Sequence, residues 1–240
     1  MSQTLTIAKR ELSALFFSPI AYLVLGIFTF IVSMLLLLTQ FSPGFPAEIR
    51  EELTWIVRLL MFVAPAISMR LLSEELKEGT IELLMTAPIS DAQVVVGKWL
   101  GAICFFGVLM SPILVHVVVL EIKANPDYGP IFTGLLGLLL VGGLYMAIGT
   151  CISAMTDSQL ISYLITALIT GGLTIGMYIL SVVQWVPNSI KNVLYYINVD
   201  QQFDGFSKGL IDVRNLLFFV SGIIFFLFLG VKMLESRRWR

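Results

Sequence analysis

Residues 20–38 read IAYLVLGIFTFIVSMLLLL, without a single charged side chain. An α-helix needs about 20 apolar residues to cross the hydrocarbon core of a bilayer, so this stretch predicts a transmembrane helix. Five further windows have the same character, and together they predict six spans: 20–38, 53–72, 94–120, 131–155, 160–183 and 216–234. The sequence therefore predicts an all-α integral membrane protein with one transmembrane domain over residues 1–240.

The composition agrees with a membrane protein. The chain of 240 residues is 58% hydrophobic and 13% charged, with a mean hydropathy of +0.93, whereas soluble domains are about one quarter charged. Its net charge of −1 argues against a nucleic-acid partner, because phosphate binding needs clustered Lys and Arg. Cys104, Cys151 and the single His116 are too few for a disulfide framework or a metal site. We read both cysteines as small core residues.

Six spans place both ends of the chain on the same side of the membrane. Basic residues lie close to the spans at both ends, among them Lys9, Arg10 and Arg237. Short basic segments next to a span favour the cytoplasmic side, so we expect both termini in the cytoplasm.

The segment before the first span, residues 3–17, predicts an amphipathic helix lying in the membrane interface. Its apolar positions recur at helical spacing, namely Leu5, Ala8, Leu12, Leu15 and Phe16. The opposite positions are Thr6, Lys9, Arg10 and Ser13. The alternative is a frayed tail, against which the regular stripe argues.

The link between the second and third spans is the most informative one, and residues 73–90 read SEELKEGTIELLMTAPIS. Gly79 breaks the helix that extends from the second span, and Thr80 can cap a short second helix. Three residues of that helix share an apolar face: Ile81, Leu84 and Met85. Ser90 and Gln93 predict a capping box that starts the third span. A loop that only connects two spans needs no apolar face, whereas a helix that docks on a soluble partner does.

Two further links are predicted. Residues 155–159 form either a tight connection or a minor second contact on the cytoplasmic side. Residues 184–215 are too apolar for a free outer loop, and we expect one or two short helices packed at the outer mouth, with Trp185, Tyr195 and Tyr196 near the headgroups.

No catalytic site emerges from the sequence. It contains no G-x-x-x-x-G-K-[ST] phosphate loop, and one histidine inside a span does not make a nucleophilic triad. We therefore expect neither an ATPase nor another enzyme, and no directly bound cofactor.

Two ionisable side chains lie inside the spans. Arg58 is expected to contact an anionic substrate or to pair with a carboxylate, the candidates being Glu51, Glu52 and Glu121. Snorkelling of Arg58 to the outer surface remains an alternative. His116 fits a hydrogen-bonded packing role better than a proton relay, because proton-coupled transport usually needs several such groups.

Pairs of small residues four apart predict close helix packing, within one subunit or between two copies. They are Gly172 with Gly176 in the fifth span, and Gly143 with Ala147 and Gly149 with Ser153 in the fourth.

Several strings together resemble an ABC-2-type exporter permease, and within that group the gliding-motility type. They are Lys9-Arg-Glu-Leu12, Ser18-Pro19, Glu74-Glu75, Gly79-Thr-Ile-Glu-Leu-Leu84, Pro88-Ile-Ser90, Gly97-Lys98, residues 203–212 and Leu234-Glu-Ser-Arg-Arg-Trp-Arg240. The resemblance spans essentially the whole chain. It rests on the order and placement of the strings, not on one diagnostic motif.

The resemblance implies a complex in a bacterial inner membrane. The pore would be formed by this chain with a second copy or a related permease, embedded in lipid, while two cytoplasmic ABC ATPases bind ATP and Mg. The short helix after Gly79 would be the coupling helix, and the contact residues are Glu75, Glu78, Thr80, Ile81, Glu82, Leu84 and Met85. Gliding-type systems often add a membrane protein with a large periplasmic domain.

Two other functions remain open at this stage: an ATP-independent transporter or channel, and a force-transmitting membrane scaffold. The scarcity of charges in the spans and the lack of an obvious inverted repeat argue against the first. The sequence does not name the cargo.

Overall fold

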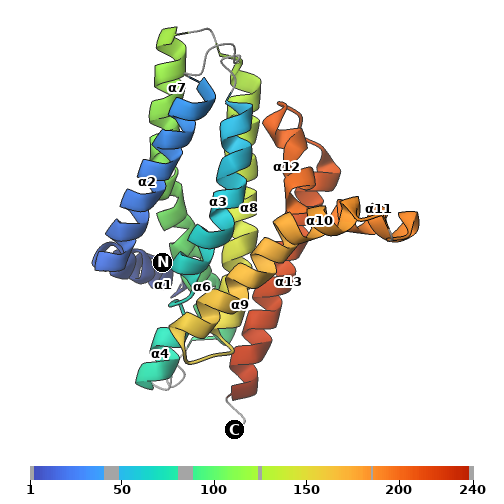
Figure 1. Ribbon diagram of the computed structural model, residues 1–240. Coiled ribbons are helices and arrows are strands. Elements are labelled where there is room, and N and C mark those ends of the chain that lie inside the picture. Colours follow the sequence, from blue (N-terminus) through green and yellow to red (C-terminus); the bar gives the residue numbers. More distant parts are fainter. Residues whose placement is uncertain (1–2, 41–48, 81–88, 124–125, 185, 238–240) are drawn as a thin grey trace.

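The computed structural model describes residues 3–40, 49–80, 89–123, 126–184 and 186–237, and these ranges are helical with short connections (Figure 1). In chain order the elements are α1 (Gln3–Phe16), α2 (Pro19–Gln40), α3 (Arg50–Ser68), α4 (Ser73–Glu78), α6 (Asp91–Leu109), α7 (Ser111–Lys123), α8 (Tyr128–Ser153), α9 (Gln159–Gly171), the π-helix η1 (Gly172–Gly176), α10 (Met177–Val182), α11 (Asn188–Ile197), α12 (Val199–Ser207) and α13 (Val213–Arg237).

Six helical stretches of the described chain are long and apolar enough to cross a membrane: Pro19–Thr39, Arg50–Glu78, Asp91–Ile122, Tyr128–Ser153, Gln159–Val182 and Val213–Arg237. Each overlaps one predicted window, and the all-α membrane fold is confirmed. Helix α4 and the end of α13 lie at one end of the bundle, and the end of α7 lies at the other (Figure 1). We name these the α4 end and the α7 end.

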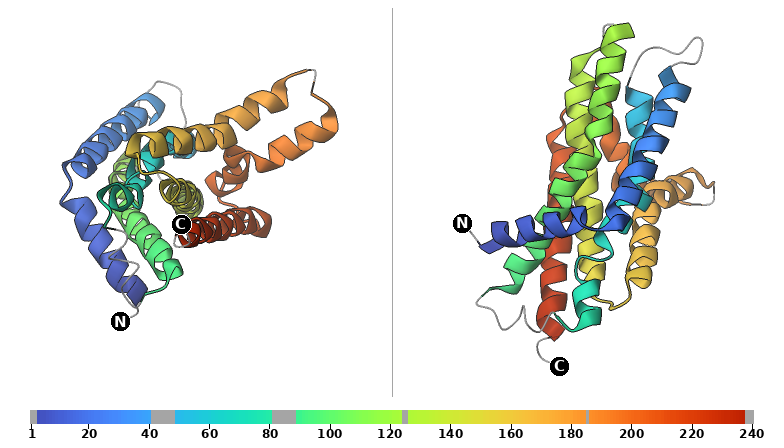
Figure 2. Two further views of the ribbon diagram at one scale, coloured as in Figure 1. Left: turned by 90° about the horizontal axis from the view of Figure 1, so that it is seen from below. Right: turned by 90° about the vertical axis from the view of Figure 1, so that its left-hand side faces the viewer.

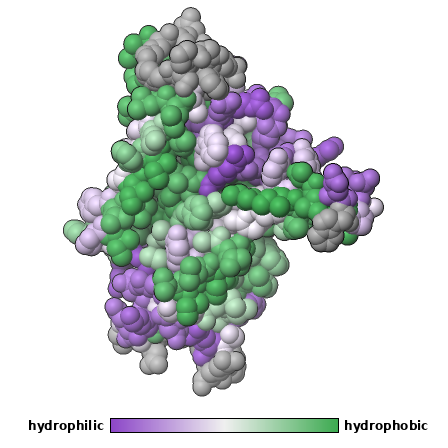
Figure 3. All heavy atoms as spheres, viewed as in Figure 1, coloured by the Kyte–Doolittle hydropathy of each residue, from purple (hydrophilic) through white to green (hydrophobic). Residues whose placement is uncertain are grey.

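The surface has the distribution that a bilayer requires. Figure 3 shows hydrophobic surface over α2 and along α9 and α10, and hydrophilic surface around α4. The helices α2, α9 and α13 keep most of their apolar side chains on the outside of the subunit. Lipid can cover such faces because the backbone polar groups are satisfied within the helices.

Helix α1 lies across the bundle instead of along it, as the right-hand view of Figure 2 shows. The predicted segment 3–17 is therefore a helix and not a frayed tail. It packs on α6 at two glycines: a Cβ at Gly97 would lie 2.9 Å from Ile7, and one at Gly101 would lie 2.8 Å from Glu11 Cβ. These close approaches fasten α1 to the third span.

Helix α8 occupies the centre of the bundle and packs against α3, α6, α12 and α13. The predicted small pair Gly143 and Ala147 is buried in this core. A Cβ at Gly143 would meet Ile223 of α13 at 3.2 Å, and one at Gly149 would lie 1.8 Å from Ser68 Oγ of α3. The small residues of the fourth span therefore let the second and sixth spans, α3 and α13, approach its backbone.

The third span differs from its prediction in two ways. It bends at Met110, where α6 ends and α7 begins. Pro112 explains the bend, because proline has no N–H and its ring clashes with the carbonyl of the preceding turn. In addition, Cys104 is exposed on α6, so its reading as a core residue is wrong, whereas Cys151 is buried.

The fifth span is interrupted by the π-helix η1, which contains the predicted packing pair Gly172 and Gly176. Among the described residues, a Cβ at Gly172 would meet nothing within 4 Å, and one at Gly176 would meet only the Gly171 carbonyl oxygen at 3.7 Å. The pair thus makes no close helix contact inside the subunit. Its use between two copies stays a prediction.

The outer segment 184–215 contains two short helices, α11 and α12. Helix α11 projects sideways from the bundle beside α10 (Figure 1). Helix α12 packs on α8 through Phe203 and Phe206, both buried. Trp185 lies outside the described residues, while Tyr195 and Tyr196 are exposed on α11.

Replacing Gly149 by Leu should separate α3 from α8, because the added side chain meets Ser68. Overpacking of this kind typically costs about 1–3 kcal/mol. We expect the apparent melting temperature in detergent to fall by several degrees, since about 1 kcal/mol shifts it by roughly 2–4 °C in a chain of this size. The control is Gly26→Leu on α2, where a Cβ meets nothing within 4 Å. Equal destabilisation by the two substitutions would contradict the close contact.

Candidate functional site

Three local features determine the path of the chain between the second and third spans. Helix α3 ends at Ser68, and the chain turns before α4 begins at Ser73. Helix α4 ends at Gly79, whose φ of 71° lies in the left-handed region that glycine tolerates. The predicted capping box is present at the start of α6: Ser90 Oγ accepts from Gln93 N, and Gln93 Oε1 accepts from Ser90 N.

The turn between α3 and α4 is held by one serine of the central helix. Ser153 Oγ accepts hydrogen bonds from the backbone N–H groups of Leu72 and Ser73, both at 2.9 Å, and donates to the Met69 carbonyl at 3.1 Å. The N–H groups of a helix start have no partner within the helix, so the hydroxyl satisfies them. The predicted pair of Gly149 and Ser153 therefore fixes this turn against α8.

The predicted coupling residues are only partly described. Ile81, Glu82, Leu84 and Met85 lie outside the described residues. Of the others, Glu78 is exposed, and Thr80 Oγ1 donates back to the Glu75 carbonyl at 3.4 Å. The side chain of Glu75 points into the protein, where it meets Lys98.

Lys98 joins three helices at the α4 end. Its Nζ lies 2.9 Å from Glu11 Oε2 of α1 and 2.9 Å from Glu75 Oε1 of α4, and its own side chain is only 4% exposed. A buried charge is tolerated only when it is paired, so this triad of Lys98, Glu11 and Glu75 constrains the three helices together. From the sequence, Lys98 contributes only to the Gly97-Lys98 string of the family resemblance. Its position two turns inside an apolar helix is the local signal that indicates a buried, paired charge.

Arg70 provides a second attachment between α1 and the link. Its Nη2 donates to the Ala14 carbonyl at 3.2 Å, and its Nη1 donates to Ser18 Oγ. The last carbonyls of a helix lack partners within the helix and carry partial negative charge, so an arginine there is favourable. Helix α1 is thus tied to the end of the second span as well as to the third.

A groove of about 590 Å³ runs between α1 and α4. Lys98 and Arg70 line it, and both are engaged within the protein. Arg10, Glu74 and Glu78 also line it and form no ion pair with another described residue. The groove therefore presents mainly carboxylates on the α4 wall and a cation on the α1 wall.

At the α7 end, α3 and α12 are joined by two arginine–aspartate pairs. Arg58 Nε lies 3.1 Å from Asp200 Oδ2, and Arg50 Nη2 lies 3.0 Å from Asp204 Oδ1, which also pairs with Lys208. Partial burial alone would raise the pKa of the Asp204 carboxyl. Hydrogen bonds from Lys208 and Arg50, with their positive charges, instead lower this pKa below its ordinary value.

The partner of Arg58 corrects our expectation, which named Glu51, Glu52 and Glu121. Glu52 is buried against His116, with Glu52 Oε1 at 2.5 Å from His116 Nδ1, and Glu121 accepts from the Tyr128 hydroxyl. His116 is accordingly a hydrogen-bonded residue of the bundle interior. Asp200 follows Arg58 by 142 positions, which no local pattern could have connected.

A buried polar cluster lies where α12 begins. Asn198 Nδ2 donates to the Thr174 carbonyl of η1 at 2.9 Å, and Asn198 Oδ1 accepts from Gln201 N at 3.2 Å. Tyr145 is fully buried near Asp200 and Thr174. Neither the Tyr145 hydroxyl nor Asp200 Oδ1 has a hydrogen-bond partner among the described residues. Buried polar atoms normally have partners, so these two are exceptions in the interior of the bundle.

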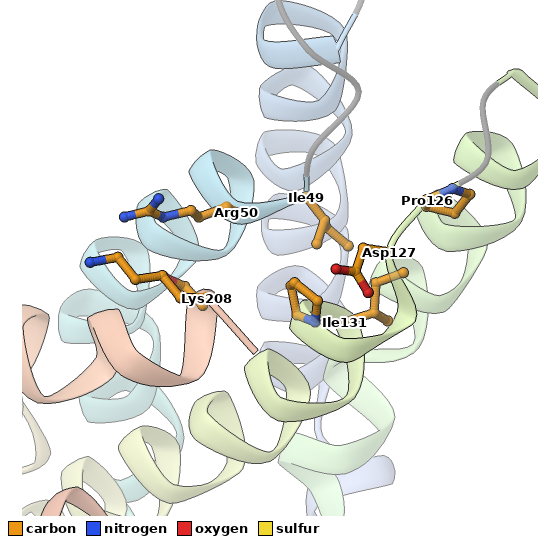
Figure 4. Close-up of a pocket in the computed structure, with 8 residues that line it drawn as sticks. Ile49, Arg50, Pro126, Asp127, Ile131 and Lys208 are labelled. Carbon is orange, nitrogen blue, oxygen red and sulfur yellow. The ribbon is translucent and has the colours of Figure 1, made fainter. Parts of the chain in front are cut away.

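A pocket of about 240 Å³ opens at the α7 end. Its walls are Ile49, Arg50, Pro126, Asp127, Pro130, Ile131, Ser207 and Lys208 (Figure 4). Asp127 Oδ1 caps α8 by accepting from Gly129 N, while Arg50 and Lys208 point away from Asp127 and pair with Asp204. The charged groups of this pocket are therefore engaged. In the part of the chain that is described, no three His, Cys, Asp or Glu gather as ligands for a metal ion.

Residues 5–203 match the family described as ABC-2 family transporter protein, which is well over half of the chain. The chain belongs to the ABC-2 family of transporters. No curated protein matches it. ABC-2 permeases span the membrane and are not ATPases themselves; they typically work with an ABC ATPase and dimerise. The family match and the six apolar helices together indicate a multi-pass membrane protein.

Replacing Lys98 by Met in this ABC-2 protein should leave Glu11 and Glu75 without their cation. Removing one partner of a buried ion pair costs about 3–5 kcal/mol, so we expect a clear fall in the melting temperature in detergent. The neutral triple variant Lys98→Met/Glu11→Gln/Glu75→Gln should regain most of that loss. Lys77→Met is the control, because Lys77 is exposed on α4. A Lys98→Met protein as stable as this control would refute the triad.

Proposed function

We propose that this chain is the permease subunit of an ATP-driven exporter and that a separate ABC ATPase drives it from the α4 end. The observation that carries this proposal is the buried triad of Lys98, Glu11 and Glu75. It ties α4, which directly precedes residues 81–88, to the interfacial helix α1 and to the third span. A force applied at this link would therefore reach three parts of the bundle at once.

The ATPase is proposed to dock on residues 81–88 and on the adjoining groove. The apolar positions Ile81, Leu84 and Met85 supply the face that a soluble partner can bury. Glu74 and Glu78 line the groove and favour a partner with basic residues. ATP and Mg would be bound by that partner, with no cofactor held by this chain.

The contact between α3 and α9 suits a movement driven in this way. Thr166, Thr170 and Thr174 form a buried stripe on α9 and η1, and each hydroxyl donates to a carbonyl one turn earlier in its own helix. Across the contact, Thr170 Oγ1 also donates to the Met61 carbonyl of α3 at 3.0 Å. When the two spans separate, the three hydroxyls keep their partners, so a path between them opens without leaving them unsatisfied.

The same proposal implies a membrane, an orientation and further partners for this chain. Six spans with basic residues at both termini favour a bacterial inner membrane with both termini in the cytoplasm, which makes the α4 end cytoplasmic. A second copy or a related permease would complete the pore. The strings at both ends of the chain favour the gliding-motility subgroup, in which a membrane protein with a large periplasmic domain is a further partner.

The test is purification of the tagged chain in mild detergent from its native membrane, with mass spectrometry of the proteins that accompany it. We expect a soluble subunit with a phosphate loop at about one copy per permease chain. Its recovery should fall at least tenfold in the Ile81→Glu/Leu84→Glu variant, because charged side chains cannot be buried in an apolar groove.

The matched control is Met155→Glu, which places a charge on the other link at the same end, where Met155 is exposed. This variant should retain the ATPase. A wild-type chain that purifies without any ATPase would overturn the proposal and favour an ATP-independent transporter or a scaffold. If the Ile81→Glu/Leu84→Glu variant and the control retained the ATPase equally well, residues 81–88 would not be the docking site.

A further inference from the structure

One face of α3 carries a cation between two aromatic side chains. Trp55, Arg58 and Phe62 follow at spacings of three and four, which places them on one side of the helix. The side chain of Arg58 is 38% exposed, and Trp55 and Phe62 are about half exposed. Figure 3 shows hydrophilic surface over α12 continuing inward toward α3, bordered by the hydrophobic surface of α10.

The guanidinium of Arg58 is held at one edge only. Its Nε pairs with Asp200, and the Trp55 ring centre lies 4.9 Å from its central carbon. No other described residue accepts a hydrogen bond from Arg58, so neither Nη group has a partner in the described part of the chain. Asp200 and Trp55 therefore fix the orientation of the guanidinium and leave its forked edge unoccupied.

The position of Arg58 along α3 makes an unpaired forked edge of its guanidinium energetically unfavourable. Arg58 lies eight residues after Arg50, where α3 begins, and ten residues before Ser68, where it ends, which corresponds to about 12 Å and about 15 Å along the helix. Arg58 is therefore near the middle of α3, within a stretch that is long and apolar enough to cross the membrane. Asp200 pairs with the Nε edge of this cation, and in apolar surroundings the forked edge still needs water or a further anionic group.

We infer that Arg58 and its two aromatic neighbours form a binding site, on the wall of the export path, for the anionic head group of an amphiphilic cargo. The inference rests on the proposed function and deepens it by naming the class of cargo. A guanidinium with a free fork binds phosphate, sulfate or carboxylate through paired hydrogen bonds. Trp55 and Phe62 supply the apolar surface for the chain attached to that head group.

The charges around this site favour an anion over a cation. Among the described residues, Arg50, Arg58 and Lys208 pair with two carboxylates, Asp200 and Asp204, while the exposed Glu51 at the start of α3 forms no ion pair with them. Asp204 is shared by two cations, and the second oxygen of Asp200 is buried. The accessible polar group between the two aromatic rings is therefore the cation.

The test uses the purified chain in dodecyl maltoside micelles, titrated with dodecyl phosphate while its melting temperature is recorded. We expect saturable stabilisation by dodecyl phosphate and none by dodecylphosphocholine, whose head group carries a compensating cation. The Arg58→Gln/Asp200→Asn variant removes both charges but keeps two side chains that can hydrogen-bond across α3 and α12. Its apparent affinity for dodecyl phosphate should fall at least tenfold.

The matched control is Arg214→Gln, which removes an exposed cation at the start of α13 and should bind within twofold of the wild type. Equal affinity in both variants, or no saturable binding by the wild type, would overturn the inference. A variant that binds dodecyl phosphate normally but no longer self-associates in light scattering would also overturn the inference, since the face would then be a subunit interface. Retention of the ATPase in the same preparations reports on the proposed function separately, so either proposal can fail without the other.

Discussion

Inside a bilayer no water reaches the backbone, and every buried N–H and C=O must find a partner within the protein. Regular helices meet this requirement by themselves, and the spans of this protein are helical for that reason. Where a helix is interrupted, some of its backbone N–H and C=O groups have no partner within the helix. At three of these places the structure shows a side chain from another element taking over a missing hydrogen bond.

Three interruptions illustrate the rule. Between α3 and α4, the Ser153 hydroxyl accepts from two free N–H groups. At the π-helix η1, Asn198 donates to the Thr174 carbonyl and also caps α12. At the end of α1, Arg70 donates to the Ala14 carbonyl. The side chains that permit a helix to break therefore also join distant segments, and the breaks become the places where spans are coupled.

Buried charged groups also need partners within the protein, and here those partners come from distant parts of the chain. Lys98 is buried at the α4 end with two carboxylates, and Glu52 is buried with His116 near the α7 end. These groups have protein partners and stabilise the arrangement of the helices. Arg58 is the contrasting case, because only one edge of its guanidinium is paired while the side chain remains partly exposed. Lys98, whose ammonium meets two carboxylates inside the protein, has a structural role, whereas the partly exposed Arg58 is the group that we propose to contact the cargo.

The sequence by itself determined the features that depend on neighbouring residues: the six spans, the stop at Gly79, and the capping box of Ser90 and Gln93. Each follows from hydrophobic length, backbone freedom or a side chain that reaches its own helix end. Only the tertiary structure decided which carboxylate pairs with Arg58, which helices Lys98 joins, and that Gly149 rather than Gly172 makes a close contact. Those outcomes depend on how helices far apart in the chain pack together, and several acidic partners are equally compatible with the local pattern around each basic residue.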